Sequence, residues 1–174
     1  LKIHAFINPM NTNTPTPPLA IIILAAGKGS RMKSPKPKVM HELAGRPMIS
    51  WLIETCEALD PAKIIVVVGE DMPSVEAAVA PHVCVVQTTQ HGTADAVKPA
   101  LPLLNGFDGQ VLILMGDEPL IPLETLREMA GYDGIVLSDI AAHKIGEGRM
   151  TAIRDYVDKL GGGFVMIGGM NSFG

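Results

Sequence analysis

Residues 20–32, AIIILAAGKGSRM, decide how the chain is expected to fold. An unbroken apolar run passes directly into a glycine-rich loop that carries Lys28 and Arg31. A continuous apolar run is typical of a strand that is covered on both faces, as in a parallel sheet. Glycines after such a strand allow backbone N–H groups to approach a ligand closely. The stretch therefore predicts a buried first strand over residues 20–26, with a ligand-binding loop at its carboxyl end.

The rest of the chain alternates short β-rich runs with helical patterns, which is typical of a parallel sheet covered by helices. The predicted fold class is α/β: a three-layer, Rossmann-like arrangement with a mostly parallel sheet and helices on both faces. Further strands are expected at residues 63–68, 83–87, 111–115, 134–139 and 162–169, and helices from about Pro47, at 73–80, from about Thr93, at 122–130 and at 148–160. Pro99 and Pro102 should end or kink the helix that begins near Thr93.

The composition describes a globular domain of ordinary size, with 47% apolar and 18% charged residues in 174. Six of the 14 Lys and Arg residues lie between Lys28 and Arg46, so the positive charge is local and nucleic acid is not an expected partner. No apolar run approaches the ~20 residues that cross a bilayer, and the first residues lack the order of a signal peptide. The cytoplasm is the expected location. Cys56 and Cys84 should be buried reduced thiols there, with a disulfide left open as the alternative.

The glycine loop fits neither of two common phosphate-binding patterns. A dinucleotide fingerprint would need a glycine at Met32, and a P-loop needs Gly-Lys-Ser/Thr after a four-residue gap. The loop instead offers backbone N–H groups, with Lys28, Arg31 and Lys38 available to neutralise phosphate oxygens. The alternative interpretation is an ordinary glycine turn with solvated lysines.

Asp117 follows the strand expected at residues 111–115. Ligands of open parallel sheets bind at the carboxyl ends of the strands, so this carboxylate is placed to bind Mg²⁺ that bridges phosphates. Glu118 is a weaker candidate for the same role. The alternative is that Asp117 is a turn residue or a helix cap.

Gln87 ends the strand expected at residues 83–87, and Gly92 and Thr93 open the helix that follows. Gln87 can offer a bidentate amide, and the helix start can offer N–H groups, to a base or a sugar. The alternative is that Thr93 only caps its helix. His91 has no positioned partner in the sequence and is assigned no role.

Together these stretches resemble the sugar-1-phosphate nucleotidyltransferases, a MobA-like nucleotidyltransferase type. The closest resemblance is to the uridyltransferase domain of bifunctional N-acetylglucosamine-1-phosphate uridyltransferase/glucosamine-1-phosphate acetyltransferases. That family carries Leu-Ala-Ala-Gly-x-Gly-Thr-Arg-Met, Pro-Lys-Val-Leu-His, Ala-Gly-Lys-Pro-Met, Gln-x-x-Gln-x-Gly-Thr-Ala and Tyr-Gly-Asp-x-Pro-Leu. The matching segments here are residues 24–32, 37–41, 44–48, 87–94 and 116–120. Ser30, Met115 and Asp95 depart from the family pattern.

The resemblance implies the roles of the matched positions. Arg31 and Lys38 would be catalytic, contacting phosphates and supporting the transfer, and Asp117 would bind Mg²⁺. The implied nucleotide-binding residues are Leu24, Ala25, Ala26, Gly27, Lys38, Gln87, Gly92, Thr93, Met115, Gly116 and Asp117. The implied reaction is the transfer of UMP from UTP to N-acetylglucosamine 1-phosphate, which gives UDP-N-acetylglucosamine for cell-envelope synthesis and releases pyrophosphate.

The expected organisation has three parts. Residues 1–18 are rich in Pro, Asn and Thr and are predicted to be a flexible segment. Met10 raises the hypothesis that natural translation starts there and that residues 1–9 are foreign to the fold. Residues 19–130 should form the UTP-binding domain, with the family resemblance covering about residues 20–130. Residues 131–174 should add a β-α-β segment that resembles part of a class I glutamine amidotransferase-like domain but contains no Cys.

In the family the domain continues into a sugar pocket and a second metal ligand, an Asn. The sequence therefore predicts a truncated uridyltransferase domain, joined near residues 130–134 to another α/β segment. Two functional hypotheses stay open: an active nucleotidyltransferase, or a nucleotide-binding remnant or fusion fragment without turnover. The resemblance implies no oligomeric state here, because the family's trimer depends on a β-helix that these residues do not include.

Overall fold

A computed structural model describes residues 17–27, 29, 32–88, 93–130, 134–138 and 163–167. The chain divides into two compact units, one of which is Pro17–Ala130. The other contains β7 (Gly134–Ser138) and β8 (Gly163–Ile167), which pair in parallel as predicted for this segment. The predicted flexible segment lies almost wholly outside the described residues, and the helix predicted at 148–160 lies outside them altogether.

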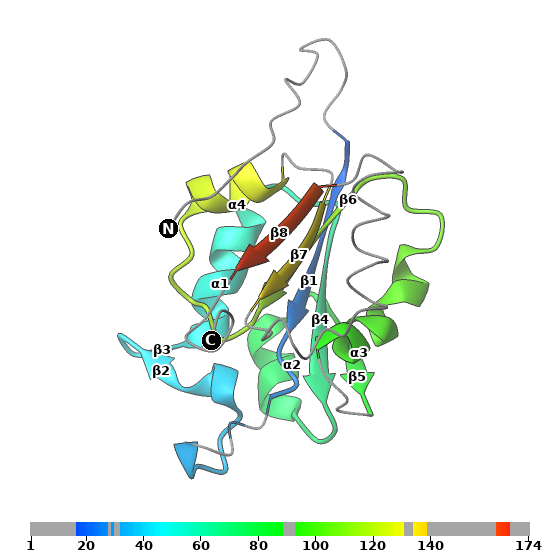
Figure 1. Cartoon of the computed structure of the whole chain (residues 1–174). Helices are drawn as coiled ribbons and strands as arrows, with labels where there is room; N and C mark the ends of the chain where they lie inside the picture. Colours follow the sequence, from blue (N-terminus) through cyan, green and yellow to red (C-terminus); the bar gives the residue numbers. More distant parts are fainter. Residues whose placement is uncertain are drawn as a thin grey trace. The chain divides into compact units, whose positions relative to one another are not determined.

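The unit Pro17–Ala130 is built on a four-stranded parallel sheet (Figure 1). Its strands are β1 (Leu19–Leu24), β4 (Lys63–Gly69), β5 (Val83–Gln87) and β6 (Gln110–Met115), in the spatial order β5-β4-β1-β6. All three pairings are parallel. The strands predicted from the apolar runs are confirmed, with ends that shift by no more than two residues.

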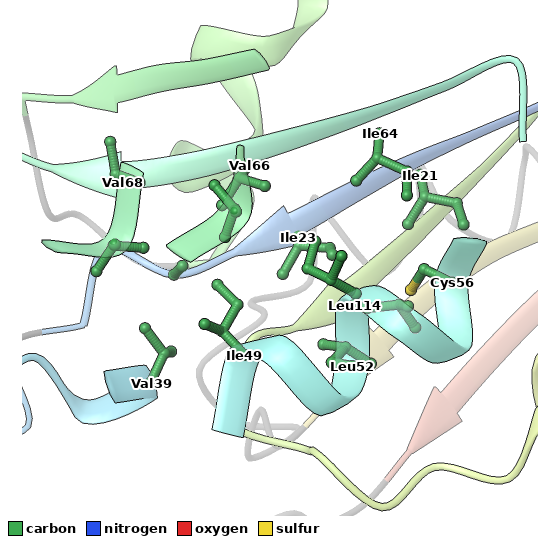
Figure 2. Close-up of a cluster of buried hydrophobic side chains, with 14 of the residues drawn as sticks. Ile21, Ile23, Val39, Ile49, Leu52, Cys56, Ile64, Val66, Val68 and Leu114 are labelled. Carbon is green, nitrogen blue, oxygen red and sulfur yellow. The ribbon is translucent and has the colours of Figure 1, made fainter. Parts of the chain in front are cut away.

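Helices cover both faces of this sheet, which confirms the three-layer prediction. On one face, α1 (Met48–Glu57), α2 (Pro73–Val79) and α4 (Leu123–Ala130) contribute side chains to the buried cluster that contains Ile21 and Ile23 of β1, and Figure 2 shows the side chains of α1 in this cluster. On the other face, α3 (Thr93–Val97) and the 3-10 helix η3 (Lys98–Leu104) pack against Ile22 and Leu24. Alternate residues of β1 thus enter two separate cores, which is why the strand is apolar throughout.

The predicted effect of the two prolines is also confirmed. Helix α3 ends at Val97, one residue before the tighter η3 that contains Pro99 and Pro102. Proline cannot donate the backbone hydrogen bond of an α-helix interior, so the chain continues in a 3-10 form.

The order of the strands creates a topological switch point. From β1 the chain moves through α1 to β4 and through α2 to β5, always to the same side of β1. It then crosses through α3 and η3 on the other face and returns to the opposite side of β1 as β6. The strand order therefore reverses between β1 and β6, and open α/β sheets bind ligands at such a point, outside the carboxyl ends of the strands.

Three short elements between β1 and α1 were not predicted. They are the 3-10 turn η2 (Lys38–Met40) and the two strands of a small hairpin, β2 (Glu42–Leu43) and β3 (Arg46–Pro47). The predicted start of α1 near Pro47 is confirmed, since the helix begins at Met48.

The two cysteines are free thiols that differ in burial. Cys56 is buried in α1, and this burial raises the pKa of its thiol to about 12. Cys84 is only half-buried on the edge strand β5, so the prediction that both thiols are buried is wrong for Cys84. Within the described part of the chain, no helix has the length and apolar character needed to span a membrane.

Candidate functional site

The backbone after β1 is fixed between the ends of its two neighbouring strands. The N–H of Ala25 donates to the carbonyl of Val67 in β4 at 2.7 Å, and the N–H of Gly116 donates to the carbonyl of Leu24 at 2.9 Å. The loop that begins at Ala25 and runs to Gly27 therefore starts at the switch point, where β1 lies between β4 and β6.

Gly29 lets η2 fold back over this loop. It has a φ of +64°, and a Cβ added there would lie 3.0 Å from the Cβ of Lys38. The N–H of Lys38 also points at the carbonyl of Gly27, at 3.4 Å. A larger side chain at position 29 would strain the backbone and push Lys38 away from the loop.

The ammonium of Lys38 forms an ion pair with the carboxylate of Asp117. Lys38 comes from η2 and Asp117 stands two residues after β6, so the fold brings together side chains that are 79 positions apart. The side chains are 41% and 21% exposed, so both groups remain open to solvent and to a ligand.

Gly116 makes the approach of η2 to β6 possible. A Cβ at this position would lie 3.0 Å from the carbonyl oxygen of Leu24 and 3.0 Å from Cγ1 of Val39. Val39 itself is 3% exposed and belongs to the core beneath Ile49 of α1 (Figure 2). A larger residue at position 116 would therefore crowd both the end of β1 and Val39, the neighbour of Lys38 in η2.

Gln87 lies at the same carboxyl edge, at the end of β5, and is buried. Gly69 at the end of β4 separates it from the β1 loop, and a Cβ on Gly69 would lie 3.2 Å from the carbonyl oxygen of Ala26. The edge therefore carries, in spatial order, the buried amide of Gln87, a glycine, the loop after β1 and the carboxylate of Asp117.

The structure brings most of the predicted site residues to this edge. Those at or beside the switch point are Leu24, Ala25, Ala26, Gly27, Lys38, Met115, Gly116 and Asp117. Thr93 begins α3, as expected from the sequence. Arg31 and Gly92, together with Lys28 and His91, lie outside the described residues. The contacts of Gly29 and Val39 were not predicted, because neither residue has a polar or charged side chain that marks it as part of a site.

The described residues offer a divalent cation one carboxylate, to which the phosphates of a nucleotide would add further ligands. Among them, no group of three or more His, Cys, Asp or Glu side chains is placed to hold a metal ion. Mg²⁺ usually keeps several waters and binds through one or two carboxylates plus substrate phosphates, and Asp117 supplies one carboxylate. Lys38 supplies the positive charge that a phosphate oxygen would need beside it.

A glycine loop, a cation and a carboxylate at the switch point are the features of α/β proteins that bind phosphorylated ligands at the end of the sheet. The model of the MobA-like NTP transferase domain matches residues 21–152, and the chain belongs to this family. The match extends 22 residues beyond residue 130, where the sequence resemblance was expected to end (152 − 130). The amidotransferase-like character of the later residues stays a prediction.

Several curated relatives named "Bifunctional protein GlmU" are similar to this chain. The one from Paramagnetospirillum magneticum is 54% identical over 111 residues, which cover 64% of this chain and 25% of the relative. The one from Sphingopyxis alaskensis is 44% identical over 151 residues, which cover 82% and 34%. The chain thus spans about a quarter to a third of the length of the curated relatives it matches.

Solved structures share the fold at low sequence identity. Rv0371c from Mycobacterium tuberculosis has a TM-score of 0.61 and 17% identity, covering 91% of this chain and 95% of that one. A nucleotidyl transferase from Methanothermobacter thermautotroptrophicus has a TM-score of 0.57 and 20% identity, covering 86% and 87%. A further structure of the mycobacterial protein is a complex with manganese. These likenesses confirm the predicted fold class.

Proposed function

We propose that this chain is a sugar-1-phosphate nucleotidyltransferase domain that transfers UMP from UTP to N-acetylglucosamine 1-phosphate. The observation that carries the proposal is the Lys38–Asp117 pair at the switch point between β1 and β6. It supplies one group for a phosphate and one for a divalent cation at the edge where the family's glycine loop begins. The resemblance to relatives named GlmU, at 44–54% identity, supports UTP and this sugar phosphate as the substrates.

In this proposal the loop from Leu24 to Gly27 contacts the nucleotide through its backbone, and Lys38 and Arg31 contact phosphate oxygens. Gln87, with Gly92 and Thr93, contacts the uracil. The burial of Gln87 supports this role, because an amide held in a dry environment discriminates well between hydrogen-bonding partners.

An oxygen of the sugar 1-phosphate attacks the α-phosphorus of UTP and forms a new P–O bond. The bond from that phosphorus to the oxygen bridging to the β-phosphate breaks, and pyrophosphate leaves with the electron pair. Mg²⁺ bound at Asp117 would neutralise charge on the phosphate oxygens. Because the attacking phosphate is already anionic, the protein needs no nucleophile. Its residues act by alignment and by stabilising charge on the phosphoryl oxygens.

The ion pair also supports a simple account of ligand entry. In the structure, Lys38 and Asp117 neutralise each other. A complex of nucleotide and divalent cation offers a phosphate to Lys38 and a positive charge to Asp117, so it replaces both partners at once. Neither the bare cation nor the bare nucleotide does so.

Pyrophosphate release from UTP, Mg²⁺ and N-acetylglucosamine 1-phosphate tests the proposal. The chain should release pyrophosphate, the Asp117→Ala variant should not, and Asp108→Ala should behave as the unchanged protein. Asp108 is the matched control because it is an exposed aspartate just before the other end of β6. Release no higher than in a blank would overturn the enzyme proposal, and UTP binding without release would favour the alternative of a nucleotide-binding domain without turnover.

The product would serve cell-envelope synthesis, and the reaction would take place in the cytoplasm. Both statements belong to this proposal and rest on the resemblance to the GlmU relatives.

A further inference from the structure

The main chain passes from Lys38 to helix α1 through the β2–β3 hairpin. Its pairs are Glu42 with Pro47 and Leu43 with Arg46. Ala44 and Gly45 at its tip have φ values of 51° and 80°. Positive φ at both central residues is the geometry of the tight hairpin turns that match strand twist. Because the hairpin is short and its turn is regular, the position of η2 at one end depends on the position of α1 at the other.

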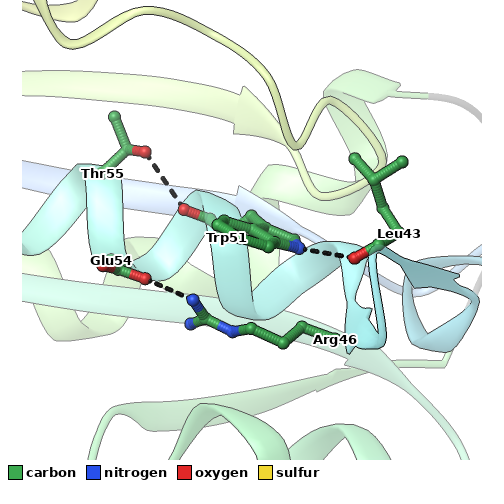
Figure 3. A network of polar contacts seen from close by, with 5 residues as sticks. All are labelled: Leu43, Arg46, Trp51, Glu54 and Thr55. Atoms are coloured by element: carbon green, nitrogen blue, oxygen red, sulfur yellow. Dashed lines mark hydrogen bonds and ion pairs between the residues drawn. The ribbon is translucent and has the colours of Figure 1, made fainter.

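An aromatic residue of α1 clamps this hairpin (Figure 3). The Nε1–H of Trp51 donates to the carbonyl oxygen of Leu43 at 2.9 Å. The guanidinium of Arg46 lies over the Trp51 ring, 4.3 Å from its centroid, and donates from Nη1 to Oε2 of Glu54 at 2.7 Å. Both strands of the hairpin are therefore attached to one face of α1.

The clamp continues by backbone contacts to the site. The N–H of Met48 donates to the carbonyl of His41 at 2.9 Å, and the N–H of His41 donates to the carbonyl of Lys38 at 3.2 Å. Between them, Val39 is buried in the core that contains Ile49. These contacts hold η2 against α1. From this position of η2, the side chain of Lys38 reaches Asp117.

The network contributes little to the two cores. Neither Trp51 nor Arg46 belongs to either buried cluster, and the side chains of Arg46 and Glu54 are 43% and 63% exposed. Exposed ion pairs of this kind are weak sources of stability. The specific effect of this network is to hold the hairpin in place and, through the hairpin, to hold η2 in place.

A second cation–π pair in the same unit has similar chemistry without such a path. Lys63, at the start of β4, lies 5.3 Å from the centroid of the Phe107 ring and donates to the carbonyl oxygen of Leu103 at 3.0 Å. It sits at the amino end of the sheet, whereas Lys38 and Asp117 lie at the carboxyl end.

We propose that Trp51 is a positioning residue: together with Arg46 it clamps the β2–β3 hairpin to α1, and thereby holds Lys38 where the phosphates of the nucleotide bind. This inference rests on the proposed function. It assigns to Trp51 no contact with substrate, and its effect passes entirely through Lys38.

A double-mutant cycle on UTP binding in Mg²⁺, measured by calorimetry, tests the coupling. Trp51→Leu should weaken UTP binding about fivefold to tenfold, because a displaced Lys38 loses part of its charge-assisted contact with the phosphates. In a Lys38→Met background the same change should have less than about a twofold effect, because the group it positions is gone. Phe107→Leu, the matched control, should have little effect in either background, and Trp51→Phe should keep part of the affinity by retaining the ring under Arg46.

Hydrogen exchange in the ligand-free protein supplies a second measurement that needs no nucleotide. Trp51→Leu should accelerate exchange of the Met40 and His41 amides, which bond to Pro37 and Lys38, and leave the amides of β1 unchanged. Phe107→Leu should not accelerate exchange in η2. This readout also shows whether the variant is folded.

The outcomes separate the two proposals. If the unchanged chain binds UTP and Trp51→Leu weakens binding equally in both backgrounds, the clamp is overturned and the proposed function stands. If the unchanged chain does not bind UTP, the proposed function fails, and hydrogen exchange decides the clamp. Unchanged exchange in η2 of the Trp51→Leu variant overturns it.

Discussion

The interior of the sheet and its carboxyl edge are held together in different ways. In the interior, Ile21, Ile22 and Ile23 of β1 and Val66, Val67 and Val68 of β4 are all fully buried, and each strand is covered on both faces. At the edge, Lys38 and Asp117 are partly exposed and joined by one ion pair. Many contacts determine the fold, whereas few determine the geometry of the site.

This difference follows from the interactions available in each region. Burial of apolar side chains is additive and non-directional, so the loss of one contact leaves the strand where it was. Partly exposed ion pairs are worth about 0–1 kcal/mol and are directional. Single substitutions should therefore change stability in the interior and ligand binding at the edge.

Ile23→Ala should produce the largest loss of stability. Ile23 is fully buried in the core beneath α1, and large-to-small substitutions there cost about 2–5 kcal/mol in free energy of unfolding. Asp117→Ala should cost less than about 1 kcal/mol, because it removes only a partly exposed pair. Urea denaturation measures both. Equal losses in the two variants would break the contrast between interior and edge.

The interior could be predicted because its signal is local and repeated. Each strand is an apolar run, and β5 occupies the same five residues that the sequence predicts. The positions of Leu24, Gln87 and Asp117 at one edge also followed from the sequence, because the ends of parallel strands meet there. Such predictions need only the strand boundaries and the handedness of the connections.

The support of the site could not be predicted in the same way. The hairpin has strands of two residues, too short for an alternating pattern, and its turn is Ala44-Gly45 rather than the usual Asn-Gly or Asp-Gly. The partner of Lys38 is 79 positions away, and several carboxylates could have met it as far as sequence shows. Val39 and Gly116 matter through a steric contact that only three-dimensional packing reveals.

Lys38→Met should strengthen the binding of a divalent cation in the absence of nucleotide. The ammonium of Lys38 forms an ion pair with the carboxylate of Asp117 and repels a metal cation that approaches the same carboxylate. Removing it should tighten Mn²⁺ binding about tenfold, or about 1.4 kcal/mol, and weaken UTP binding. Electron paramagnetic resonance of free Mn²⁺ measures the first effect.

Lys36→Met is the matched control for this measurement. Lys36 is also a lysine in an ion pair, with Glu42 at 3.1 Å, but it does not contact Asp117. Mn²⁺ affinity should be unchanged in this variant. Weaker or equal Mn²⁺ binding in Lys38→Met would contradict the exchange of partners at the site.

Ala44→Gly, in the hairpin turn, should give the smallest effect, a gain in the free energy of unfolding. Ala44 has a φ of 51°, and an L-residue in this region costs about 1–2 kcal/mol. Glycine avoids that cost but loses about 0.5–1 kcal/mol through the greater freedom of the unfolded chain. The net gain should be about 0.5 kcal/mol in the free energy of unfolding.

Ala77→Gly, in the exposed interior of α2, should instead lose about 0.5–1 kcal/mol. In urea denaturation, changes of opposite sign in the free energy of unfolding of the two variants would show that the hairpin carries backbone strain that α2 does not. A loss of stability in both variants would show that Ala44 is not strained.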